Sequence, residues 1–272
     1  MIKNFAEVEG KLAAGAGARK VVLAGEADGH SMAALEEARA KWGIEFLAGD
    51  LSAAEAVSLI KEGRGDVLMK GGIATGDLLK AVVNRENGIG LGGLMSHIAA
   101  FECPNYHKLL FITDGGMVPN PDLEQKAQIL TNALRFMRSL GYNNPKVAAL
   151  AAAESVNPKM PETAEAAELM RRAAAGEFGA CTLEGPISFD LAISPESAAL
   201  KGYESQISGK TDLMLTPNIA AGNILGKTLI YLANSTMAGC ILGAKVPIIL
   251  TSRGATTQEK LLSLALALTA KN

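Results

Sequence analysis

The chain has 272 residues, a formal net charge of −2, 49% hydrophobic residues and only 4% aromatic residues. This length allows one large or two small domains, and the balanced charge lacks the basic field typical of nucleic-acid-binding proteins. Cys103, Cys181 and Cys240 stand far apart with neither zinc-ligand nor disulfide-framework spacing, which favours a reducing cytoplasm. The N-terminus is polar and acidic, unlike a signal peptide, and no apolar run reaches the roughly 18 residues of a membrane helix.

Strand-like and helix-like segments alternate along the first hundred residues. β-branched and leucine-rich runs predict strands at 20–25, 44–47, 66–69 and 96–101. Helical spacing predicts a helix over 31–42, with Ser31 as N-cap, and two more over 52–62 and 75–84. Such alternation is typical of parallel βαβ units with right-handed crossovers.

The alternation continues to the end of the chain. Further strands are predicted at 108–113, 146–150, 212–216, 239–243 and 246–250. Further helices are predicted from Pro121 to about 140, over 162–175 and 220–233, and from about Thr256 onward. The sequence therefore predicts an α/β fold.

A hydroxyl, a guanidinium and a glycine follow the last predicted strand. Ser252, Arg253 and Gly254 stand between that strand and a helix N-terminus, where open α/β sheets bind ligands. Helix N-termini attract anions, and the arginine fork suits phosphate or carboxylate. Glu259 follows Thr256 by three residues, so it is either a catalytic group or the second member of a capping box. The spacing leaves both interpretations open.

A lysine and two glycines end the strand predicted at 66–69. The N–H groups of Gly71 and Gly72 are suited to cradling a phosphate, with Lys70 and Lys80 supplying charge. The alternative is a glycine turn flanked by solvated lysines. The sequence is compatible with both interpretations.

Two other patterns in the sequence contain residues that can form sites. The stretch 221–228, ending in Gly226-Lys227-Thr228, matches a loosened phosphate-loop pattern, but its apolar spacing favours a helix that has already begun near Ala220. His30, His97 and His107 lack the partners of a metal site, so no metal is expected. Ser252 lacks a nucleophile-elbow sequence.

Taken together, the motifs resemble the phosphate acyltransferase family, which includes phosphate acetyltransferase and phosphate butyryltransferase. The matching segments recur in order along most of the chain: 68–71, 75–80, 96–102, 106–114, 120–126, 206–212, 217–223 and 252–254. The length and the segment His107–Phe111 are closer to the butyryl branch than to the acetyl branch.

The resemblance implies two α/β domains across a cleft, an architecture like that of isocitrate and isopropylmalate dehydrogenases. Residues 1–107 and 241–272 would form one domain, and residues 108–240 the other. It further implies a homodimer or higher homo-oligomer that converts acyl-CoA and phosphate to acyl phosphate and CoA. CoA would be a substrate, with no cofactor, nucleic acid or membrane involved, and the acyl group would be butyryl or similar.

The resemblance also assigns roles to individual residues. Ser252 and Arg253 fall on the family's Ser-Arg pair, and Glu259 falls where the acetyl branch has an aspartate proposed to deprotonate the CoA thiol. Lys80 stands in place of a phosphate-binding arginine, which keeps the charge but loses the fork. The remaining residues expected to bind substrate are Lys70, Thr75, Ser96, His97, Asn218, Asn223 and Gly254.

Two other functions remain open from the sequence. One is a nucleotide-dependent phosphotransferase that uses Lys227, and the other is a catalytically silent, CoA-binding family member.

Overall fold

The computed structural model describes residues 2–15, 19–251 and 254–270, so Ser252 and Arg253 lie outside the described residues. Contacts divide the chain into two units, which we call the terminal unit (Ile2–Met95 with Thr236–Asn272) and the middle unit (Ser96–Ser235). Both boundaries lie earlier in the chain than those expected at 107/108 and 240/241. The first boundary moves because the strand that begins at Ser96 pairs with the next strand of the middle unit.

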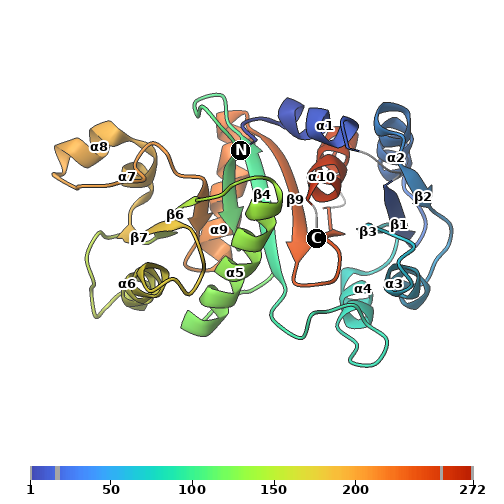
Figure 1. The fold of residues 1–272 in the computed structure, drawn as a ribbon, viewed down its shortest axis with the longest axis horizontal. Helices are drawn as coiled ribbons and strands as arrows, with labels where there is room; N and C mark the ends of the chain where they lie inside the picture. Colours follow the sequence, from blue (N-terminus) through green and yellow to red (C-terminus); the bar gives the residue numbers. More distant parts are fainter. Residues whose placement is uncertain (1, 16–18, 252–253, 271–272) are drawn as a thin grey trace. The chain divides into compact units, whose positions relative to one another are not determined.

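The terminal unit is a sheet with helices on it (Figure 1). Its strand order is β2-β1-β3-β10-β9, and only β9 is antiparallel to its neighbour β10. The strands are β1 (Lys20–Ala24), β2 (Glu45–Leu47), β3 (Val67–Lys70), β9 (Thr236–Leu242) and β10 (Ile248–Ile249). The helices are α1 (Phe5–Ala13), α2 (Gly29–Trp42), α3 (Ala53–Lys61), α4 (Thr75–Val82) and α10 (Thr257–Thr269).

Helix α10 is the buried helix of the terminal unit. All its residues from Lys260 to Thr269 are buried, and it packs against α1, α2 and β9 (Figure 1). A helix that is apolar on all sides is expected in a core. Near its end, the Thr269 hydroxyl donates to the Val8 carbonyl at 3.3 Å. The packing of α10 and this hydrogen bond at its end hold the helix at a defined place on the unit.

The middle unit has the strand order β4-β5-β8-β6-β7, with β4 antiparallel to β5 and the other pairs parallel. Helices α5 and α9, which follow the neighbouring strands β5 and β8, lie on opposite faces of this sheet (Figure 1). The strands are β4 (Ser96–Glu102), β5 (Leu110–Thr113), β6 (Lys146–Leu150), β7 (Thr182–Ile187) and β8 (Leu213–Leu215). The helices are α5 (Leu123–Ser139), α6 (Pro161–Ala174), α7 (Phe189–Ile193), α8 (Pro195–Leu200) and α9 (Ile219–Ala233).

Several elements differ from the sequence prediction. Strand β7 was not predicted; it contains Pro186 and lies at the edge of the sheet, where proline is tolerated. Helices α1, α7 and α8 were also not predicted. Helix α2 begins at Gly29 behind the N-cap Asp28, not at Ser31. Helix α5 begins after Asp122, whose capping box with Gln125 replaces the expected start at Pro121.

In each unit, an aspartate stands directly before one strand. This aspartate forms two hydrogen bonds with the backbone of the first residue of the neighbouring strand. In the middle unit, the Asp212 backbone N–H donates to the Lys146 carbonyl, and the Lys146 N–H donates to Asp212 Oδ2, both at 2.8 Å. In the terminal unit, Asp66 and Lys20 make the same two hydrogen bonds, also at 2.8 Å. We call this arrangement the aspartate clamp, and it fixes the register of β6 with β8 and of β1 with β3.

The two clamps differ in burial. Lys108 Nζ donates to Asp212 Oδ1 and to the Lys210 carbonyl, each at 2.5 Å, and both charged side chains are buried. Asp66 is exposed. A buried ion pair offsets its desolvation only when its hydrogen bonds are satisfied, as they are for Asp212.

Candidate functional site

The carboxyl ends of β1, β3 and β10 meet at one edge of the terminal unit. Ala24 is in register with Lys70, and Met69 is in register with Ile249. The loops that follow these strands are therefore neighbours. The predicted residue Lys70 ends β3, and Thr75, Gly254 and Glu259 belong to the loops or to the helices they enter. This edge is where parallel sheets bind ligands.

The two glycines after β3 do not cradle a phosphate as the sequence suggested. The Gly71 N–H donates to the Ala24 carbonyl at 2.8 Å, and the Gly72 N–H donates to the Glu26 carbonyl at 2.7 Å. A Cβ on Gly71 would lie 2.5 Å from the Glu26 carbonyl oxygen. Glycine is needed here for close packing of two loops, and the two N–H groups are used in that packing; Lys70 is partly buried, and its Nζ donates to the Gly71 carbonyl at 3.1 Å.

Helix α4 starts at this edge without a side-chain cap. Its N-cap is Ala74, and the first helical residue, Thr75, is exposed. Uncapped N–H groups and a threonine hydroxyl suit a phosphate oxygen. Lys80 lies in the last turn of α4, 83% exposed, with Nζ 3.8 Å from Asp77 Oδ1.

The start of α10 carries Glu259. The Thr256 hydroxyl oxygen accepts a hydrogen bond from the Glu259 backbone N–H at 3.1 Å, which is the first half of a capping box. Glu259 is partly exposed and Gly254 is exposed. The structure leaves both roles of Glu259, base and cap, open.

A buried lysine joins the starts of α10 and α2. Lys260, only 3% exposed, donates from Nζ to Asp28 Oδ2 at 3.0 Å and to the Ser31 hydroxyl at 2.8 Å. His30 Nδ1 lies 2.9 Å from Thr257 Oγ1. Burial acts to raise the pKa of Asp28, but hydrogen bonds from the Ser31 N–H and Lys260 outweigh it, and the pKa is lowered. Sequence reasoning missed this pair, although a lysine within a Leu- and Ala-rich helix is a signal.

In the middle unit, the buried carboxylate of Asp114 organises the turn after β5. Its Oδ2 accepts from the His97 N–H at 3.0 Å, and its Oδ1 accepts from the N–H groups of Gly116 at 2.7 Å and Met117 at 2.8 Å. The start of β4 is thereby tied to the end of β5. Asp114 was not among the predicted site residues; its position directly after an apolar strand was the available signal.

The predicted residues Ser96 and His97 lie beside this turn. The His97 ring packs against Gly116, and its Nδ1 is buried without a hydrogen-bond partner among the described residues. Burial lowers the pKa of His97 against the opposing effect of the Asp114 charge, so the imidazole is neutral at pH 7. The Ser96 hydroxyl is buried and accepts from Asn132 Nδ2 at 3.1 Å.

Asn218 and Asn223 hold the start of α9. Asn218 is the N-cap, and its Oδ1 accepts from the Ala221 N–H at 2.9 Å. Asn223 Nδ2 donates to the Gly115 carbonyl at 3.2 Å. The backbones approach so closely that a Cβ on Gly222 would lie 2.7 Å from the Asp114 carbonyl oxygen. The structure thus brings Ser96, His97, Asn218 and Asn223 together around the turn that Asp114 organises.

Residues 221–228 lie within α9, so the phosphate-loop alternative is wrong. Their backbone belongs to a regular helix and does not form a loop around an anion. The helical spacing of the apolar residues, weighed against the motif in the sequence, gave the correct prediction.

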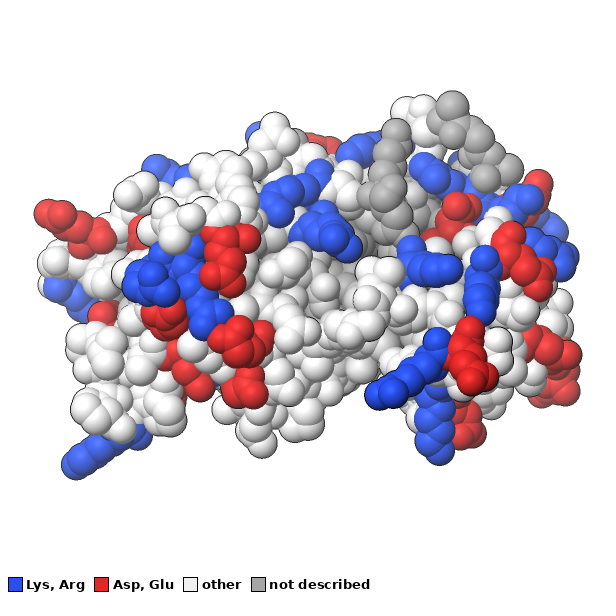
Figure 2. Space-filling model, turned by 60° about the horizontal axis from the view of Figure 1, so that its bottom comes forward, with Lys and Arg blue, Asp and Glu red and all other residues white. Residues whose placement is uncertain are grey.

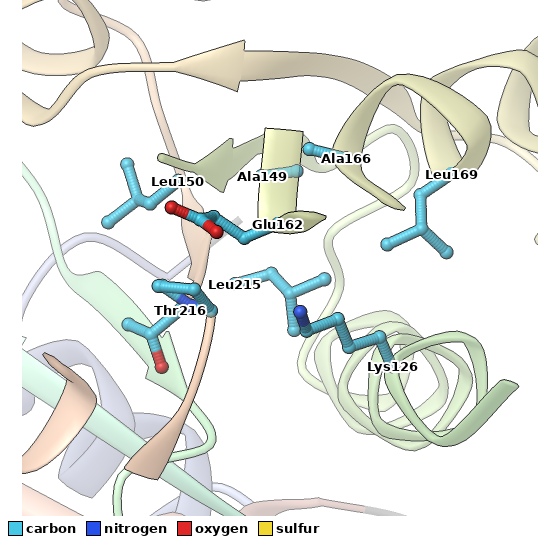
Figure 3. Close-up of a pocket in the computed structure, with 9 residues that line it drawn as sticks. Lys126, Ala149, Leu150, Glu162, Ala166, Leu169, Leu215 and Thr216 are labelled. Atoms are coloured by element: carbon cyan, nitrogen blue, oxygen red, sulfur yellow. The ribbon is translucent and has the colours of Figure 1, made fainter. Parts of the chain in front are cut away.

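A small cavity of about 10 Å³ lies at the carboxyl ends of β6 and β8. Figure 3 shows Lys126 and Glu162 among apolar side chains around it. Lys126 is buried and paired with Glu165. The cavity has room for about one water molecule.

Several exposed charged side chains form ion pairs, such as Arg171 with Glu168 and Lys201 with Glu154. Basic and acidic residues are interspersed on the face in Figure 2.

Within the described residues, no three His, Cys, Asp or Glu side chains gather as a metal site would require. None of the described helices is both long and apolar enough to cross a membrane.

Comparison with known proteins places these features in one family. The family described as "Phosphate acetyl/butaryl transferase" matches residues 46–268. The chain is 45% identical over 219 residues to a "Probable phosphate butyryltransferase" of Bacillus subtilis (80% of this chain, 73% of the relative). It is 41% identical over 212 residues to a phosphate acetyltransferase of Thermotoga maritima (78% and 72%).

Solved structures agree with this assignment. A branched-chain phosphotransacylase from Enterococcus faecalis superposes with a TM-score of 0.83 at 32% identity, covering 93% of this chain and 98% of that one. A protein from Salmonella typhimurium described as a 4-hydroxythreonine-4-phosphate dehydrogenase shares the fold alone, with a TM-score of 0.54 at 14% identity (94% and 100%). The expected α/β, dehydrogenase-like fold is confirmed. Because the match spans most of its length, the chain belongs to the phosphate acetyl/butyryl transferase family, the enzymes that convert acyl-CoA and phosphate to acyl phosphate and CoA.

Proposed function

We propose that this acyltransferase acts on butyryl or a similar short acyl group, in the cytoplasm, and without a metal. The observation that carries the proposal is the junction of β10 and α10, where Ser252-Arg253-Gly254 precedes the capped helix start that bears Glu259. The butyryl assignment is supported by the relative from Bacillus subtilis. The cytoplasmic assignment is supported by Cys103, Cys181 and Cys240, which are free thiols.

The proposed chemistry follows from the residue types at this edge. A thiol is mostly protonated at neutral pH, so Glu259 accepts the CoA thiol proton as the sulfur attacks the acyl carbon. The carbon–oxygen bond to phosphate then breaks, and phosphate leaves with the electron pair. Ser252 stabilises the carbonyl oxygen as it gains charge, while Arg253 and Lys80 offset the phosphate charge. Thr75 and the free start of α4 add hydrogen bonds to phosphate.

A chain-length series tests the proposal. The purified protein is incubated with CoA and acetyl, propionyl, butyryl or isobutyryl phosphate, and thioester formation is followed by absorbance. We expect the highest kcat/KM with a four-carbon acyl group. Binding of CoA without turnover of any acyl phosphate would instead identify a catalytically silent family member.

Arg253→Ala is expected to raise the KM for phosphate about 10- to 100-fold, because a charged hydrogen bond contributes roughly 1.5–3 kcal/mol. Steady-state kinetics in the direction that consumes phosphate measure this effect. Arg64→Ala is the matched control, since Arg64 precedes β3 at the opposite edge of the same sheet. An unchanged phosphate KM in Arg253→Ala would remove Arg253 from the site.

The homodimer belongs to the proposal and is supported by the outer face of α9. Ile224, Tyr231 and Leu232 are 66%, 74% and 82% exposed, and Lys227 is the one charged residue in the α9 sequence. Most surface helices present polar residues to water, so an exposed apolar stripe marks a contact surface. A second copy of the chain is the proposed partner.

Leu232→Glu is expected to weaken dimerisation about 10- to 100-fold, because burying a leucine contributes roughly 1.5–3 kcal/mol. Light scattering across a concentration series gives the molar mass. Leu200→Glu, at a leucine of α8 that is 89% exposed, is the control and should leave the mass unchanged. Equal masses for Leu232→Glu and the unsubstituted protein would contradict the assignment of this face.

A further inference from the structure

We infer that Lys260, together with Asp28 and Ser31, acts as a positioning group that sets the direction of Glu259 in acyl transfer. The inference rests on the proposed role of Glu259 and adds residues to which neither the family match nor the relatives assign a role. Lys260 does not act on substrate here; it acts through its neighbour in the chain.

The contacts that carry the inference all lie in the first turn of α10. The Thr256 hydroxyl caps the helix, Thr257 contacts His30, and Lys260 contacts Asp28 and Ser31. Thr257 and Lys260 are three residues apart and therefore lie on one face of the helix, toward α2. Gln258 and Glu259 are not on that face; Gln258 is exposed and Glu259 is partly exposed. The contacts of Thr257 and Lys260 thus fix the rotation of the first turn of α10 about the helix axis. This rotation sets the direction of the Glu259 side chain.

The contacts of Lys260 with Asp28 and Ser31 are suited to orienting the helix start and not only to packing it. Lys260 is buried, but the Asp28 side chain is 53% exposed, and an ion pair with an exposed partner contributes little to stability. The hydrogen bonds of Lys260 are directional, however, and its Nζ is held by an oxygen of Asp28, the N-cap of α2, and by the hydroxyl of Ser31 in the first turn. Asp28 also caps α2 by accepting from the Ser31 N–H at 2.7 Å. One carboxylate therefore ties the starts of both helices together.

The test uses two variants that each remove one charge of the Lys260–Asp28 ion pair but keep the packing or capping function of the side chain. Lys260→Met keeps the length of the side chain, and Asp28→Asn keeps the N-cap, because asparagine caps helices as well as aspartate does. Each is expected to lower kcat about 10-fold or more while changing the KM for CoA and phosphate by less than about twofold, since a small misplacement of a catalytic group affects the chemical step.

The E259Q background decides whether Lys260 acts through Glu259. If it does, adding Lys260→Met to E259Q lowers kcat no further; if it acts independently, the two losses multiply. Lys126→Met is the matched control, because it removes another buried lysine ion pair, that with Glu165 in the middle unit. It is expected to lower thermal stability and leave kcat unchanged.

The outcomes separate this inference from the proposed function. An unsubstituted protein that transfers no acyl group would overturn both. An active protein in which Lys260→Met and Asp28→Asn lower the melting temperature but keep the original kcat overturns the inference alone. Multiplying losses in the E259Q background overturn it as well.

Discussion

Glu259→Gln is expected to lower kcat about 100- to 10,000-fold, the usual contribution of a positioned general base. The substitution separates the two roles that the sequence and the structure leave open. Glutamine serves as the third residue of a capping box as well as glutamate does, so the helix start is retained. Only the ability to accept the thiol proton is lost. Steady-state kinetics with CoA and butyryl phosphate measure the effect.

Glu55→Gln is the matched control for this prediction. Glu55 occupies the same position in α3, where its carboxylate and the Ser52 hydroxyl form a complete capping box. The control should retain full activity and an unchanged melting temperature. If Glu259→Gln behaves in the same way, Glu259 is a helix cap and the base must be sought elsewhere.

Asp212→Ala is expected to lower the free energy of unfolding by about 3–5 kcal/mol, because it leaves the buried Lys108 ammonium without its carboxylate. It also removes the acceptor for the Lys146 N–H. Lys108 and Asp212 are only 6% and 3% exposed, so water cannot replace the lost partner. Urea denaturation followed by circular dichroism measures the change, and the loss should appear as a lower midpoint.

The other aspartate clamp supplies the control. Asp66→Ala removes the same backbone hydrogen bond, here from the Lys20 N–H, but at an exposed position. The expected loss is about 1 kcal/mol, the net contribution of one hydrogen bond. Equal losses in the two variants would mean that the buried ammonium adds nothing to the clamp of the middle unit.

The sequence predicted most strands and helices because their apolar periods are regular. It failed where one residue type has two uses. Pro121 suggested a helix start that Asp122 supplies instead, and the edge strand β7, which contains Pro186, was not predicted at all. Local propensity cannot decide such cases, since the outcome depends on which neighbour provides the hydrogen bonds.

The candidate site was predictable in outline and not in its supporting contacts. The position of Glu259 after the last strand follows from the chain order alone. The partners of Lys260 do not, because Asp28 lies at the other end of the sequence and only the packing of α10 on α2 brings them together. The glycines after Lys70 show the reverse case: their pattern suggested an anion, but their N–H groups are taken by the neighbouring loop.

The strand order of the middle unit bears on how the protein is made. β8 lies between β5 and β6, although it is the last of the three to leave the ribosome. Until it arrives, the nascent chain carries two hydrophobic strands whose facing backbone edges have no partner, and such edges recruit other chains. The short segment Leu213–Leu215 thus completes the sheet by pairing with both strands. The time the ribosome takes to reach it is the interval in which a chaperone would protect this protein most.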